Sequence, residues 1–153
     1  MDEVDVVIAA PPEQVWALVT DITRMGEWSP ENRGGRWTAG ATGSAVGARF
    51  VGVNAHGPIR WRTRCRVVEC APPSRFAFTV AESGMTWGWR LEPAGTGTRL
   101  VQWRERTGRS TLLARLVVRT GVLGRAREEL MVDGMRRTLA AVRATAEARA
   151  AAG

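Results

Sequence analysis

The chain has 153 residues, of which 44% are hydrophobic and 24% charged, a balance typical of a globular protein and not of a disordered chain. This length predicts a single domain over residues 1–153. No segment approaches the roughly 20 apolar residues of a membrane span, and the N-terminus lacks a secretion-signal pattern, so a cytoplasmic protein is expected. All 22 basic residues are arginines and the net charge is +7, which indicates GC-rich coding before any chemical demand for guanidinium groups.

The N-terminal segment predicts a strand followed by two short helices. Apolar and polar residues alternate within Asp2–Ala9, as they do in a half-buried strand. Pro12 suits the first turn of a helix, and apolar residues then recur at the spacing of one helical face. Asp21 is placed to cap a second helical turn.

Six further strands are predicted up to about residue 107, separated by turns rich in Gly, Pro and Asn. Their connections are too short for parallel crossovers, so the sheet should be antiparallel. The segment IRWRTRCRVVE alternates arginine with neutral residues, which predicts one wet and one dry face. The predicted strands lie near Asn32–Thr38, Ala48–Ala55, Ile59–Glu69, Arg75–Ala81, Thr86–Glu92 and Thr98–Thr107.

The C-terminal part of the chain predicts helices. Ser110 is a candidate cap for a basic amphipathic helix that ends near two glycines. A longer helix is predicted from about Arg125 to Arg149. The economical packing of these elements is an α+β fold, in which a curved seven-stranded antiparallel sheet carries its helices on one face. The apolar stripe expected to cover the dry face consists of Leu130, Met131, Met135, Leu139, Val142 and Ala146.

Five stretches resemble the START-related lipid-transfer superfamily, also called SRPBCC, and in particular its bacterial polyketide cyclase/dehydrase-like members. The resemblance implies a helix-grip fold, with the sheet wrapped around the C-terminal helix and enclosing a cavity for hydrophobic or aromatic molecules. Some members cyclise and dehydrate polyketides, whereas others bind or carry lipids, hormones or quinones, so the fold alone leaves the function open. The stretches are VVIAAPPEQVWALVTDITRMGEWSPE, VGARFVGVN followed by IRWRTRCRVVECAPPSRFAFTV, GTRLVQWRE, and LMVDGMRRTLAAVRATAE.

Alternation within each strand selects the residues expected to face the cavity. Tryptophan stacks on flat apolar rings and methionine adapts to irregular shapes, so this set suits an aromatic or polycyclic ligand. The alternative is that the same aromatic residues form a solid core. In the strand near residues 48–55 either face could point inward. The predicted ligand-binding residues are Trp28, Trp61, Thr63, Phe78, Trp87, Trp89, Trp103, Met131 and Met135.

Glu105 is expected on the inward side of the last strand, beside Trp103. A desolvated carboxyl there could move a proton during an aromatising cyclisation, which would make Glu105 the candidate catalytic residue. The alternative is a rim residue paired with an arginine. Binding of a hydrophobic small molecule is therefore the first hypothesis, and a polyketide cyclase/dehydrase-type enzyme is the second. The chain has no tyrosine, so a phenolic acid is excluded.

An outward arginine face is also predicted. Like charges on neighbouring strands are mildly destabilising, so this face is either simply solvated or is used to bind an acidic protein partner or an anionic membrane surface. No nucleic acid is expected, because no stacking platform accompanies the charge. Glu92 is the only acid expected among these residues. The predicted face consists of Arg60, Arg62, Arg64, Arg66, Arg90, Arg104 and Arg106.

Few residues in the sequence are suited to metal or cofactor chemistry. Cys65 and Cys70 would lie roughly 16 Å apart on one strand, too far to form a disulfide. His56, beside Gly57, is expected in an exposed turn. No phosphate-binding loop or metal-spaced cluster is present, so neither a metal nor another cofactor is predicted. The sequence leaves the oligomeric state open.

Overall fold

The computed structural model describes residues 1–109 and 125–153, and the helix predicted from Ser110 lies outside the described residues. The boundaries of the strands agree with the predictions to within two residues at each end. In chain order the elements are β1 (Asp2–Ile8), α1 (Pro12–Val19), the 3-10 helix η1 (Ile22–Glu27), β2 (Asn32–Thr38), β3 (Arg49–His56), β4 (Ile59–Ala71), β5 (Arg75–Val80), β6 (Met85–Ala94), β7 (Gly97–Arg106) and α3 (Arg125–Ala152).

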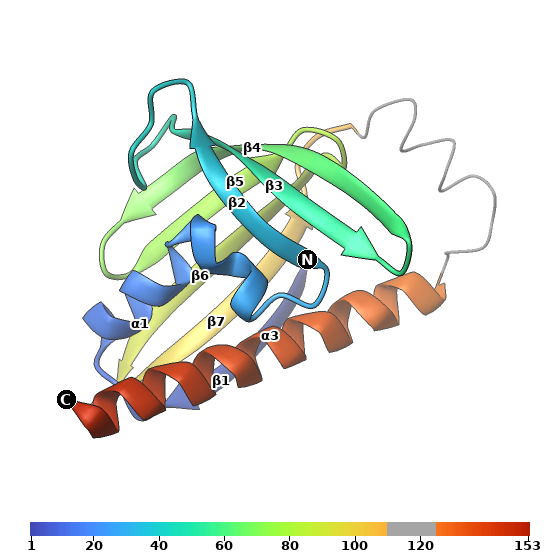
Figure 1. The fold of residues 1–153 in the computed structure, drawn as a ribbon. Helices are drawn as coiled ribbons and strands as arrows, with labels where there is room; N and C mark the ends of the chain where they lie inside the picture. Colours follow the sequence, from blue (N-terminus) through green and yellow to red (C-terminus); the bar gives the residue numbers. More distant parts are fainter. Residues whose placement is uncertain (110–124) are drawn as a thin grey trace.

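The strands form one antiparallel sheet in the order β1-β7-β6-β5-β4-β3-β2. Strands β2 to β7 follow one another as hairpins, while β1 returns to pair with β7 at the far edge. Helices α1 and η1 connect these two edges, and both lie with α3 on the concave side of the curved sheet (Figure 1). The predicted α+β, helix-grip architecture is therefore confirmed.

Local sequence signals start and stop the first helices. Pro12 is the first residue of α1, where its missing N–H costs no hydrogen bond. Thr20 ends α1, and its hydroxyl donates a hydrogen bond of 2.8 Å to the Trp16 carbonyl. Asp21 caps η1 by accepting from the Thr23 backbone N–H at 3.2 Å. The predicted cap at Asp21 is confirmed.

The core lies between the sheet and the helices. Helix α3 packs on β1, β7 and α1. Within this core, Phe50 lies 5.2 Å from Phe78 in an edge-to-face contact, with Phe76 beside them. Leu130 was predicted to belong to the buried stripe, but it is 60% exposed, because it lies on the solvent side of the first described turns of α3. The helix residues that are buried are Met135, Thr138, Leu139, Val142 and Ala146.

The register of the sheet decides which residues face the helices, because residues directly opposite each other share a face. Phe50 pairs with Cys65, which pairs in turn with Val80, and all three are buried on the concave side. The sequence left open which face of β3 points inward, and the structure selects the face that carries Phe50. No helix among residues 1–109 and 125–153 is long and apolar enough to cross a membrane.

Candidate ligand-binding site

The concave face of β4, β5 and β6 carries the residues predicted for it. Trp61 and Thr63 alternate inward on β4, and Phe78 pairs with Trp87 across β5 and β6. Trp89, two residues further along β6, pairs with the buried Phe76. The predicted inward orientation of these side chains is therefore confirmed.

The prediction was wrong for β7, where every side chain lies on the face opposite to the expected one. Val4 on β1 points into the core and pairs with Gln102, so Gln102 faces inward. Trp103 pairs with Glu3 and Gly88 on the convex face, and Glu105 pairs with Thr86 on the same side. The proton-transfer role of Glu105 required its carboxyl group to lie beside a ligand on the concave face. The register places Glu105 on the convex face instead, so this requirement is not met.

Trp103 lies on the convex face because Gly88 makes room for it there. A Cβ atom built on Gly88 would come within 2.1 Å of the Trp103 ring, so the ring lies directly over the backbone of β6. A glycine in a strand often marks such a close approach. Alternation assigned Val101 and Trp103 to the interior, but Leu100 beside Val101 is also apolar, so the pattern of β7 fits either face.

The reversed orientation of β7 also changes the face on which two arginines lie. Arg104 and Arg106 were predicted on the outward face, but Arg104 pairs with Trp87 and lies on the concave face with a side chain that is only 6% exposed. Its Nη2 lies 2.6 Å from Asp2 Oδ2, and its guanidinium lies 5.7 Å from the centre of the Trp87 ring. The ion pair offsets part of the cost of burying this charge.

The predicted binding residues divide by accessibility. Trp61 is 37% exposed, and Thr63, Trp87 and Met131 are half-buried, so a ligand could reach them. The inner half of the set is packed into the hydrophobic core and could at most support the site from behind. The buried residues are Trp28, Phe78, Trp89 and Met135. We refer to the part of the concave face around Trp61, Thr63 and Trp87 as the open half.

A chain of polar side chains crosses the open half. Asn54 Nδ2 donates to Thr63 Oγ1 at 3.2 Å, and Asn32 Nδ2 donates to Asn54 Oδ1 at 3.4 Å. These residues surround Gly52, where a Cβ atom would lie 2.8 Å from Thr63 Oγ1. The absence of a side chain at Gly52 therefore lets three strands contribute polar groups to one patch.

A further polar group lies deeper in the concave face. Gln102 is 8% exposed, and its Oε1 atom has no hydrogen-bond partner among the described residues. Native proteins rarely leave such atoms unpaired, and each exception calls for a reason such as a ligand. Sequence reasoning missed Gln102 because it assigned the wrong face of β7 to the interior.

The thiols and the surface hollows add no second site. Burial raises the pKa of the Cys65 thiol to about 12, so this cysteine is inert at neutral pH. Within the described ranges, no three His, Cys, Asp or Glu side chains gather closely enough to hold a metal ion. One hollow of about 560 Å³ is formed by residues 38–49, and another of about 400 Å³ lies between β1 and α3; neither is lined by the predicted binding residues.

Comparison with known proteins agrees with the fold. The chain is similar to the Polyketide_cyc-like protein Cgl2372 from Corynebacterium glutamicum, with 32% identity over 93% of this chain and 88% of that one, at a TM-score of 0.60. TTHA0849 from Thermus thermophilus is 20% identical over 96% of this chain and 97% of its own, at a TM-score of 0.71. This second likeness concerns the fold alone.

A third structure, the di-domain ARO/CYC StfQ from the steffimycin biosynthetic pathway, is 15% identical. The match covers 96% of this chain and 44% of StfQ, at a TM-score of 0.66, and it too concerns the fold. A search of the curated proteins gave no match. A family model described as polyketide cyclase / dehydrase and lipid transport matches residues 3–147. With nearly the whole chain matched and the helix-grip architecture in place, the chain belongs to this polyketide cyclase/dehydrase and lipid transport family of the SRPBCC superfamily.

Proposed function

We propose that the chain binds a hydrophobic small molecule, aromatic or polycyclic in character, against the open half of the concave face. The observation that carries the proposal is the state of Trp61, which points to the concave side and yet remains 37% exposed. Covering apolar surface stabilises a complex by roughly 25 cal/mol per Å², and a flat ring can also stack on the indole. Trp87 and Met131 offer further apolar surface for the same ligand.

The polar groups of the open half suit a ligand that carries a few oxygens. Thr63 Oγ1 accepts a hydrogen bond from Asn54 and keeps its own hydrogen to donate. Arg104 adds a positive charge next to Trp87. By register, Thr63 and Trp87 lie four residues and two strands apart, roughly 16 Å between their Cα atoms. Apolar walls with a few placed polar groups are typical of small-molecule sites.

The charges favour binding over catalysis. Among the described strands, Asp2 is the only carboxylate on the concave face, and it is ion-paired with Arg104. A general acid or base must reach the ligand and exchange its proton, which an ion-paired carboxylate at the start of β1 is poorly placed to do. The cyclase/dehydrase alternative, which the family also includes, therefore lacks an evident proton-transfer group on these strands.

The test is a titration with N-phenyl-1-naphthylamine, a neutral aromatic dye that fluoresces in apolar surroundings. We expect saturable binding to the wild-type protein. Trp61→Ala should weaken it about tenfold or more, since the lost contact is worth roughly 1.5–3 kcal/mol. Trp103→Ala is the matched control, because it removes a tryptophan from the convex face.

Two outcomes would contradict the proposal. Equal loss of dye binding in both variants would point to nonspecific or unfolding effects, and an unchanged affinity in Trp61→Ala would move the ligand elsewhere. Glu105→Gln should leave the affinity unchanged, because its side chain lies on the far side of the sheet. Conversion of a poly-β-ketone thioester by the purified protein would instead support the enzyme alternative.

A further inference from the structure

The hairpin formed by β3 and β4 extends beyond β5. β4 begins at Ile59, but its pairing with β5 starts only at Cys65. The first six residues of β4 therefore have a strand neighbour on one side only, which is β3. In Figure 1 this hairpin projects from the sheet on the side where the first turns of α3 lie. We refer to residues 49–66 as the β3–β4 hairpin.

One face of the β3–β4 hairpin, together with the neighbouring β2, is strongly basic. Arg60, Arg62, Arg64 and Arg66 all point to the convex side and are exposed, which confirms the predicted outward orientation of these four. Alternate residues of a strand are spaced about 6.6 Å apart, so the row runs for about 20 Å. Arg36 on β2 and Arg49 on β3 lie on the same side and widen the row into a patch. We refer to these six residues as the arginine patch.

Most of the arginine patch lacks a counter-ion. Arg64 binds Glu82 at 2.9 Å, and it is the only member with a carboxylate partner within the described part of the chain. Arg49 and Arg66 are directly opposite each other, a mildly unfavourable arrangement for like charges. The patch therefore carries unneutralised positive charge.

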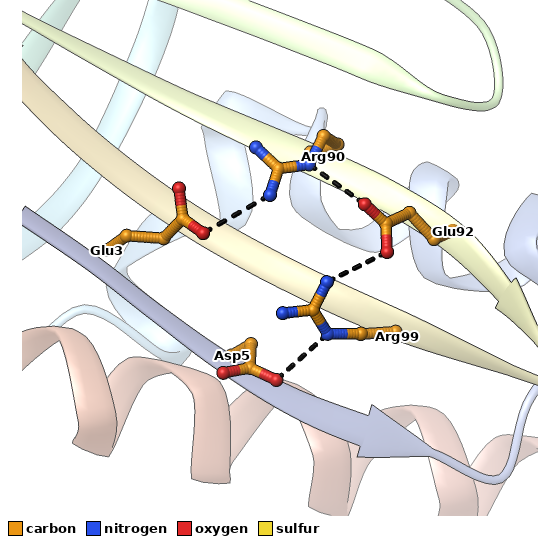
Figure 2. Close-up of polar contacts among 5 residues, drawn as sticks. All are labelled: Glu3, Asp5, Arg90, Glu92 and Arg99. Atoms are coloured by element: carbon orange, nitrogen blue, oxygen red, sulfur yellow. Dashed lines mark hydrogen bonds and ion pairs between the residues drawn. The ribbon is translucent and has the colours of Figure 1, made fainter.

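The other half of the convex face shows the opposite arrangement. Figure 2 shows Arg90 bound to Glu3 and Glu92, while Arg99 is bound to Glu92 and Asp5. Hydrogen bonds from Arg99 and Arg90 hold the pKa of Glu92 below its usual range. Glu92 was the only acid predicted among the outward arginines, and this was too few, because β1 contributes Glu3 and Asp5. Arg90 and Arg99 are therefore neutralised by nearby carboxylates, whereas most arginines of the arginine patch are not neutralised by any described residue.

An apolar side chain lies among the arginines of the patch. Val53, directly opposite Arg62 on the convex face, is 37% exposed, whereas Ile59, which is 63% exposed, lies on the same side of the hairpin as Trp61. Trp61 lies between Arg60 and Arg62 in the chain and faces the other side of the hairpin. Arginines beside an exposed aliphatic group are a combination found at membrane–water interfaces.

We propose that the β3–β4 hairpin docks on an anionic lipid bilayer, with the arginine patch against the headgroups and Val53 at the interface. A purely electrostatic protein partner would leave the exposed Val53 without a role, so the bilayer fits both observations better. Each basic residue near an anionic membrane surface is worth about 1 kcal/mol, or about a fivefold change in affinity. The proposal is independent of ligand binding, and its test reads membrane binding alone.

The test is flotation of the full chain with vesicles of phosphatidylglycerol and phosphatidylcholine in equal amounts, compared with pure phosphatidylcholine. We expect binding to the anionic vesicles only, and its loss at about 1 M salt, where the Debye length is about 3 Å. R60Q/R62Q should weaken this binding about 25-fold. V53N should weaken it further at intermediate salt.

The matched control is R136Q/R137Q, which removes two exposed arginines from α3 and changes the net charge equally. It should bind vesicles like the wild type, and thermal unfolding should show that every variant folds. An equal loss in the two double variants would overturn the proposal, because net charge alone would then explain the binding. So would wild-type protein that ignores anionic vesicles but binds poly-L-glutamate through Arg60 and Arg62, which would identify an acidic protein as the partner.

Discussion

Replacement of Gln102 by methionine tests whether the buried amide group lowers the free energy of unfolding of the ligand-free protein. Gln102 is 8% exposed between the core residues Val4 and Trp89, and its Oε1 atom has no protein partner among the described residues. An unpaired buried polar group costs roughly 1–3 kcal/mol. Methionine has the same unbranched shape and similar length, so it should fill the space without strain.

We therefore expect the free energy of unfolding of ligand-free Gln102→Met to rise by about 1–2 kcal/mol, with an increase in Tm of roughly 2–8 °C. Urea unfolding followed by tryptophan fluorescence would measure the change. Gln14→Met, on the exposed side of α1, is the control and should stay within about 0.5 kcal/mol of the wild type. A fall in stability of about 1 kcal/mol or more, relative to this control, would refute the reasoning, since it would mean that the amide is well paired in the folded protein.

Three further predictions follow from single contacts. Glu147 accepts from the backbone N–H at the end of β1, which holds its pKa below the usual range; Glu147→Ala should lower the Tm at neutral pH, with the difference shrinking as the pH falls through the lowered pKa. Gly88→Ala should cost roughly 1–3 kcal/mol in urea unfolding, because the new Cβ would collide with Trp103, and Gly88→Ala/Trp103→Ala should recover part of it. Iodoacetamide should alkylate Cys70 before Cys65 in native protein, as mass spectrometry would show; equal rates would contradict the burial of Cys65.

The fold could be predicted from the sequence because its signals are local. Strict alternation in β4 and the short Gly- and Pro-marked turns between β2 and β7 fix the strands and their antiparallel order. Pro12 and Asp21 mark the helix starts without reference to the rest of the chain. Leu130 shows the limit of this reasoning, because an apolar residue at the margin of the predicted stripe can still lie on the solvent side of α3.

The face of β7 was mispredicted because it follows from the pairing of β7 with its neighbours and not from its own sequence pattern. Trp89 on β6 and Val4 on β1 both lie opposite Gln102, so both neighbouring strands place Gln102 on the concave side. The partners that explain the reversal, Asp2 for Arg104 and Gly88 for Trp103, lie on neighbouring strands. Where both faces of a strand carry apolar as well as polar residues, the orientation of the strand follows from its neighbours and not from its own sequence pattern.

A difference in strand length connects the two proposed surfaces. β4 has 13 residues and β5 has 6, so the first half of β4 extends beyond the layer that β5 and β6 complete. On the concave side this leaves Trp61 and Thr63 without the packing that buries Cys65 and Val67. On the convex side it leaves Arg60 and Arg62 beyond the reach of the acids on β1 and β6. Period-two alternation then gives this one extension an apolar side and a basic side, so a hydrophobic ligand and an anionic surface would meet the protein at opposite faces of the same hairpin.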